Sequence, residues 1–186
     1  MKKSLIFCMT LIVFTFPQSL NAEQSNDQTK VTIESGPLSI SPAENEIVFD
    51  VNEDEEEVTD SVGEITVVDA TGSWEGWNVT VQASQLKEEG NPEETLPPGS
   101  LHLTHAEATI KEEAGAGQRP SWTIDHPTAI DQEPVKILAA EPNRGMGTYH
   151  IQFSDESLIL DLPEDEEFND QTTYQSTMTW TINKGP

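Results

Sequence analysis

The C-terminal stretch of the chain alternates apolar and polar side chains over the positions 174 to 182. One face is mainly aromatic and aliphatic, with a small serine between: Tyr174, Ser176, Met178, Trp180 and Ile182. The other face carries uncharged polar side chains: Gln175, Thr177, Thr179 and Thr181. Strict alternation with many threonine and aromatic residues predicts a strand that buries one face. A similar strand is predicted at Trp77–Gln82, where a tryptophan is again followed two positions later by an aliphatic residue.

Shorter β-like segments precede and separate these two strands, with glycine- and proline-containing turns between the segments. They are Val31–Ile33, Leu38–Ile40, Glu46–Val51, Glu64–Val68, Leu101–Ile110, Val135–Ala139, Thr148–Phe153 and Leu158–Leu160. A weak helical pattern occurs at Ala106–Ala114, and residues 111–134 are predicted to form one long polar loop. The whole pattern predicts an all-β fold with a single domain. It is either an antiparallel β-sandwich of Greek-key or Ig-like type, or a partly closed barrel.

The N-terminus has the pattern of a secretory signal peptide. Lys2 and Lys3 precede an apolar run, and Ala22 supplies a small residue for cleavage. We therefore expect a signal peptide at 1–22, a flexible N-terminal segment at 23–30 and the domain at 31–186; an uncleaved N-terminal anchor is the alternative. The single cysteine, Cys8, leaves with the signal peptide, so no disulfide is expected in the mature fold. The predicted location is extracellular, without membrane insertion after cleavage.

The chain is strongly acidic, with 9 Lys+Arg against 34 Asp+Glu and a formal net charge of −25. Removal of the signal peptide's two lysines makes the mature protein more negative still. Such a surface repels nucleic acid and anionic lipid, and we expect neither as a partner. It equally disfavours simple attraction to anionic wall polymers. Contact with a wall would need stacking, hydrogen bonds, bridging cations or a partner protein.

No residue pattern indicates catalysis, a bound metal or a cofactor. His102 and His105 are close in sequence, but side chains three apart on a strand point to opposite faces. Serine-nucleophile and zinc-protease motifs are absent. The chain has two acidic runs, Glu53–Glu57 and Glu164–Glu167. Around the first, Asp50, Asn52 and Asp54 fit the start of an EF-hand loop, but Glu55 stands at the glycine position and Ser61 at the final glutamate position. Both runs are interpreted as solvated loops, with weak multivalent calcium binding as the alternative. We predict that the protein is not an enzyme.

The tryptophans are the candidate binding residues. Trp74 lies in a glycine-rich turn, Thr71–Gly76, and is expected to be exposed. Trp77 and Trp180 lie on apolar strand faces, so they either bridge the sheets or line a surface groove where an indole stacks on a sugar or a partner. Trp122 either binds a ligand from its loop or fixes that loop to the body.

Several segments, in this order, resemble the WxL domain, a surface domain of low-GC Gram-positive bacteria. They are Asp69–Val81, Leu101–Leu103, Gly145–Tyr149 and Tyr174–Ile182, followed by Pro186. The resemblance extends from about residue 31 to the end of the sequence. Val79 and Ile182 stand where the family usually has leucine, and each keeps a branched aliphatic side chain on the same strand face.

The resemblance implies a secreted, non-catalytic protein held non-covalently on the cell surface through peptidoglycan. It also implies WxL-interacting surface proteins as partners, so a subunit attached to the wall only indirectly is the alternative. The expected ligand- or partner-binding residues are Trp74, Trp77, Asn78, Val79, Trp122, Trp180 and Ile182. The polar side chains of the two tryptophan strands could hydrogen-bond to glycan or to a neighbouring strand. Sortase anchoring is not expected, because the C-terminus has no Leu-Pro-x-Thr-Gly signal.

Overall fold

The alternating C-terminal stretch forms β15 (Thr172–Lys184), the longest strand in the described part of the chain. A computed structural model describes residues 35–42, 46–52, 55–163, 168 and 172–186. The predicted signal peptide, the 23–30 segment, the Val31–Ile33 strand, Glu53 and Asp54 of the first acidic run and the whole of the second run lie outside these residues. Within the described ranges every regular element is a strand, so the all-β prediction is confirmed. No helix in these ranges could span a membrane.

The other strands follow closely the turn-separated pattern of the sequence. In chain order they are β1 (Leu38–Pro42), β2 (Glu46–Val51), β3 (Glu57–Asp60), β4 (Glu64–Asp69), β5 (Trp77–Ala83), β6 (Lys87–Glu88), β7 (Asn91–Thr95), β8 (Leu101–Leu103), β9 (Thr109–Ala116), β10 (Ser121–Trp122), β11 (Thr128–Ala129), β12 (Val135–Ala140), β13 (Met146–Gln152) and β14 (Leu158–Asp161).

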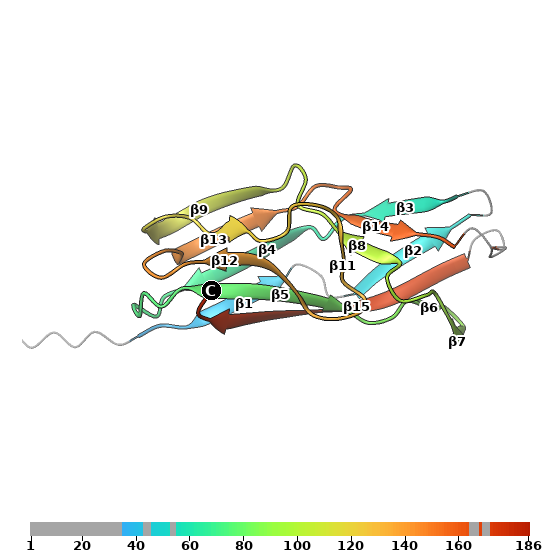
Figure 1. Ribbon diagram of the computed structural model, residues 1–186, viewed down its shortest axis with the longest axis horizontal. Coiled ribbons are helices and arrows are strands. Elements are labelled where there is room, and N and C mark those ends of the chain that lie inside the picture. Colours follow the sequence, from blue (N-terminus) through green and yellow to red (C-terminus); the bar gives the residue numbers. More distant parts are fainter. Residues whose placement is uncertain (1–34, 43–45, 53–54, 164–167, 169–171) are drawn as a thin grey trace, which may run out of the picture. The chain divides into compact units, whose positions relative to one another are not determined.

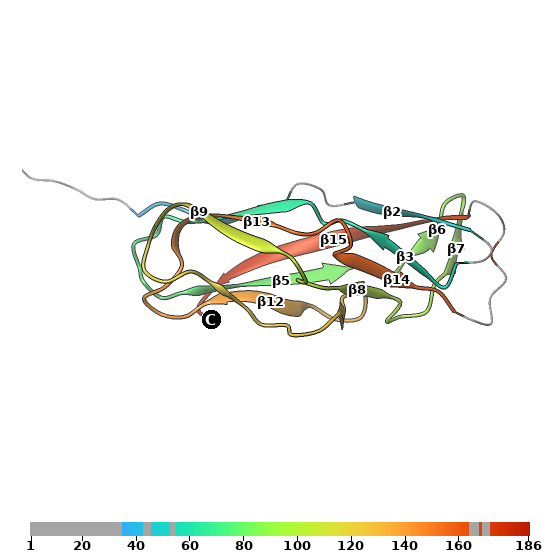
Figure 2. The same ribbon diagram turned by 90° about the horizontal axis from the view of Figure 1, so that it is seen from above.

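The strands form three antiparallel sheets, and none closes into a barrel within the described residues. The main sheet has the order β10-β12-β5-β15-β6-β7, with β2 also paired to β15. The second sheet has the order β1-β4-β13-β9, and the third β11-β8-β14-β3. Figure 1 shows β9, β13 and β4 lying over β12 and β5, and Figure 2 gives the view from above. The β-sandwich is therefore the alternative that holds.

β15 joins the two halves of the main sheet because it changes partners along its length. Its first half pairs with β2 from Thr172 to Thr177, and its second half pairs with β5 from Met178 to Lys184. The burial pattern alternates along both β5 and the first half of β15. The predicted inward and outward faces of these strands are therefore confirmed.

A single apolar cluster fills the space between the sheets, and Trp77 is its largest fully buried side chain. The indole crosses from β5 to the ring of Tyr149 on β13, with ring centroids 6.4 Å apart. Its Nε1–H donates to the Gly145 carbonyl at 2.8 Å, so the one polar atom of the ring is satisfied. Gly145 has φ 72°, and a Cβ there would lie 2.8 Å from that same Nε1. Glycine is therefore required where the indole meets the backbone.

Two parts of the sequence interpretation are wrong. The weak helical pattern at Ala106–Ala114 belongs to a turn followed by β9, which pairs with β13 across its whole length. The loop predicted at 111–134 is shorter than expected, because β9 extends to Ala116 and the rest of the segment contains β10 and β11. The helical appearance arises because β9 is almost entirely exposed and carries no alternating apolar face. An edge strand without that alternation gives no periodic signal.

We expect Trp77→Phe to lower the free energy of unfolding by about 1–3 kcal/mol, because it leaves the buried Gly145 carbonyl without its donor. Urea denaturation monitored by circular dichroism measures this change. Tyr149→Phe is the control, since its hydroxyl bonds to Met146 O at 3.2 Å in a less buried setting. An unfolding free energy equal to that of the wild type in Trp77→Phe would contradict the assignment.

Candidate functional site

Trp74 is the tryptophan that the fold leaves at the surface. Its side chain is 40% exposed, and Val48 is the other large apolar side chain with comparable exposure in the described residues. Trp74 lies three residues before β5, in the connection from β4, and Gly185 near the C-terminus donates its N–H to the Gly76 carbonyl beside it. The connection from β4 to β5 that carries Trp74 therefore lies at the same end of the sandwich as the C-terminus (Figure 1).

The backbone holds Trp74 in a conformation that a bulky residue rarely adopts. Its φ is 59°, in the left-handed region. The Trp74 carbonyl accepts the Asn143 N–H at 3.0 Å. A Cβ built on Gly117 would lie 3.5 Å from the indole Cζ3, so the ring lies against that glycine. Two neighbouring loops thus fix an exposed indole, and strain at such a residue is a recurrent feature of binding sites.

Beside this turn, the outward face of the β5–β15 pair carries uncharged polar side chains. They form three cross-strand pairs by Cα register: Asn78 with Asn183, Thr80 with Thr181, and Gln82 with Thr179. We call these six residues the polar ladder. Asn78 Nδ2 also donates to the Gly185 carbonyl at 2.7 Å, which ties the ladder to the C-terminus. None of the six carries a charge, although the chain contains 34 acidic residues.

The outward face of the opposite sheet differs from the polar ladder in its charge. There His150 Nδ1 lies 3.2 Å from Glu64 Oε1, and His150 Nε2 lies 3.2 Å from Glu113 Oε2. Thr66 Oγ1 lies 3.2 Å from the same Nδ1, and Lys111 is the cross-strand neighbour of His150. Hydrogen bonds to Glu113 and then Glu64 raise the pKa of His150 above its usual 6.5. The two faces of the sandwich thus have different chemistry.

The remaining sequence-predicted binding residues are mostly buried. Trp77 and Val79 are fully inaccessible and pack in the core. Trp180 and Ile182 are partly buried and pack against the same core, so they are less available for stacking than Trp74. The Trp180 ring lies 6.3 Å from that of Phe153, and its Nε1 is buried with no partner.

Trp122 fixes its loop to the body of the sandwich. It lies on β10, paired with Leu138, and its ring lies 5.6 Å from that of Phe153 in an edge-on arrangement. The centroid of the His105 ring lies 5.0 Å from that of Trp122. His102, by contrast, has its Nδ1 3.2 Å from Asp161 Oδ2, so the two histidines lie in different surroundings.

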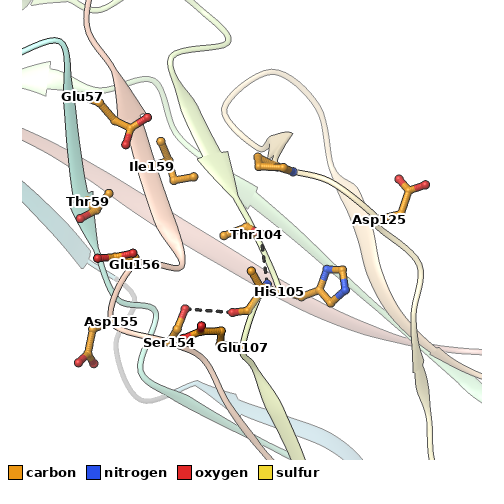
Figure 3. Close-up of a pocket in the computed structure, with 12 residues that line it drawn as sticks. Glu57, Thr59, Thr104, His105, Glu107, Asp125, Ser154, Asp155, Glu156 and Ile159 are labelled. Carbon is orange, nitrogen blue, oxygen red and sulfur yellow. Dashed lines mark hydrogen bonds between the residues drawn. The ribbon is translucent and has the colours of Figure 1, made fainter.

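A groove of about 780 Å³ lies at the loop that contains His105 (Figure 3). Its polar groups are partly used within the loop: Ser154 Oγ donates to the Ala106 carbonyl at 3.1 Å, and Thr104 Oγ1 accepts the Ala106 N–H. Carboxylates of β3 and of the turn before β14 border it. Among the described residues, no group of three His, Cys, Asp or Glu side chains is arranged to hold a metal ion.

The family model described as "WxL domain surface cell wall-binding" matches residues 17–186. The chain belongs to the WxL family. This membership assigns the protein a wall-binding role at the cell surface. Neither a curated protein nor a solved structure matches the chain.

The sequence predicted Trp74 and most polar side chains of the ladder as candidate binding residues, but it did not predict which strands and loops lie next to one another. Trp74 was expected to be exposed, and the structure confirms this. The sequence placed polar side chains on the outward faces of both tryptophan strands without indicating that these strands are neighbours. Alternation fixes a strand's face, whereas pairing between residues about a hundred positions apart leaves no local signal. The contacts of Trp74 with Asn143 and Gly117 were missed for the same reason.

We expect Trp74→Gly to be more stable than Trp74→Ala by about 0.5–1 kcal/mol. Both variants lose the indole, but alanine keeps the strain of the left-handed backbone conformation, which glycine does not have. The free energy gained by removing this strain exceeds the entropic cost of ordering the more flexible unfolded glycine. Urea denaturation of the two variants measures the difference. An alanine variant as stable as the glycine variant would contradict the strained conformation.

We expect His150 to titrate above pH 6.5, as followed by NMR of its ring protons. A raised pKa in the folded state means that the ion pairs stabilise the fold fully below about pH 6.5, and that this contribution is lost as the pH rises through the folded pKa. Glu113→Gln should lower the pKa of His150. A His150 pKa at or below 6.5 in the wild type would contradict the geometry.

Proposed function

We propose that this WxL protein is a secreted, non-catalytic surface protein whose domain binds peptidoglycan directly and non-covalently. In this proposal residues 1–22 direct secretion, residues 23–30 are a flexible N-terminal segment, and residues 31–186 form the wall-binding domain. The observation that carries it is Trp74, an exposed indole held in a strained conformation by contacts from two loops. An aromatic face fixed at the surface can stack on a sugar ring without first losing conformational freedom.

The charge of the protein restricts how it can contact a wall. A net charge of −25 disfavours attraction to anionic wall polymers, which favours direct contacts through uncharged groups. Trp74 and the polar ladder are such groups: Trp74 lies three residues before β5, and the ladder begins at Asn78 on that strand. Their stacking and hydrogen-bonding chemistry supports peptidoglycan, rather than an anionic polymer, as the ligand.

A second candidate function is a subunit that reaches the wall through a WxL-interacting partner protein. The acidic surface favours it, because carboxylates are suited to a basic face of another protein. In that arrangement the partner would supply the wall contact.

We expect the purified mature protein, residues 23–186, to pellet saturably with isolated sacculi from which anionic wall polymers have been stripped. Trp74→Gly should weaken this binding about tenfold, because the stacking surface is lost while the turn is relieved of strain. Val48→Ala is the matched control, since Val48 is an equally exposed apolar side chain (45%) on β2.

Two outcomes would overturn parts of this proposal. Pelleting that appears only after a surface partner is added would replace direct binding by the subunit function. Equal binding by wild type and a folded Trp74→Gly would keep wall binding but remove Trp74 from it. Circular dichroism of each variant separates loss of binding from loss of fold.

A further inference from the structure

The polar ladder contains no acidic side chain, which is unusual for this chain. About one residue in five is acidic, yet no outward position of Trp77–Ala83 or Met178–Lys184 is. The neighbouring outward position on β12 is Lys136, in register with Thr80. Acidic side chains reappear where β15 changes partner, at Glu46 and Asp50 of β2. The uncharged area therefore coincides with the β5–β15 pairing.

The chemistry of the ladder argues against several classes of occupant. Its outward side chains are hydroxyls and amides, so it offers little apolar area for a second copy of this chain. It lacks the carboxylates that a basic protein face would require, and these are plentiful elsewhere on the surface. An anionic polymer would meet the charge of the whole protein. A neutral molecule rich in hydroxyl and amide groups remains as the occupant that fits.

The ladder also has a regular spacing. Successive pairs are two residues apart, or about 7 Å along the strands, and the two strands lie about 4.8 Å apart. Its members stay accessible: Thr179, Thr181 and Asn183 are exposed, and the three β5 side chains are half-buried. Repeated donors and acceptors along a straight line suit an extended polymer with repeating polar groups.

We propose that the polar ladder is the site for the glycan strand of the wall, and that it binds the uncharged sugar backbone rather than the peptide stems. The threonine hydroxyls donate to or accept from sugar hydroxyl and N-acetyl groups along the strand. The amides, which also bond to Gly185, to Gln132 and between Asn183 and Asn78, contribute their remaining donors and acceptors. Trp74, beyond the start of β5, adds one stacking contact at the end of the row. The inference rests on the proposed peptidoglycan binding and assigns it a ligand class and a surface.

The test uses the neutral β-1,4-linked hexasaccharide of N-acetylglucosamine as the probe, titrated into the mature protein by calorimetry. Thr181→Glu places a carboxylate in the centre of the ladder and should weaken binding at least tenfold. Thr148→Glu is the matched control, because Thr148 lies on the central strand β13 of the opposite sheet. It should leave binding unchanged.

A second variant guards against effects of an added charge on folding. Thr179→Val combined with Thr181→Val removes two hydroxyls and keeps the branched side chains that suit a strand. It should weaken hexasaccharide binding about fivefold with an unchanged circular dichroism spectrum. The same variants are compared by pelleting with sacculi.

The outcomes separate this inference from the proposed function. Loss of both hexasaccharide and sacculus binding in the ladder variants, with Thr148→Glu unaffected, supports the glycan site. Sacculus pelleting without hexasaccharide binding by the wild type overturns the glycan site but keeps wall binding. Equal effects of Thr181→Glu and Thr148→Glu overturn the ladder as the surface. Failure of the wild type to pellet with sacculi overturns the proposed function itself.

Discussion

The insertion of Trp77 between the sheets is the constraint on which the rest of the structure depends. Its indole spans from β5 to Tyr149 on β13, and its N–H requires the carbonyl of Gly145 at close range. Because a side chain at Gly145 would collide with the indole, glycine is needed for the path that the 141–145 loop takes past Trp77. That path brings the Asn143 N–H to the Trp74 carbonyl. A buried tryptophan thereby positions an exposed one three residues earlier in the chain.

The same arrangement separates the roles of the two tryptophans. Trp77 contributes packing and one satisfied hydrogen bond, which are structural tasks. Trp74 contributes little burial and occupies a strained backbone conformation, which an unconstrained turn would relax. A strained backbone and an exposed ring are the features on which the proposed binding role of Trp74 rests. In that proposal the sandwich is a rigid support for a small, uncharged contact surface.

The sequence predicted the parts of this surface that depend on local pattern. Alternation correctly gave the inward faces of β5 and β15, because one face of each strand packs in the core. Turn composition gave the exposure of Trp74. β9 was missed because its side chains lie almost entirely in solvent, so no apolar alternation distinguishes it from a loop. The pairing of Thr80 with Thr181 was not predictable, because register between distant strands is set by the packing of the whole core.

NMR mapping of soluble peptidoglycan fragments, free of anionic wall polymers, on the labelled mature protein tests direct binding at Trp74 and the polar ladder. Such binding predicts saturable shift changes at the Trp74 indole N–H and at the amides of Thr80, Thr179 and Thr181, with His150 on the opposite face unaffected. Changes confined to the His150 face, or none at saturating fragment concentrations, would contradict it.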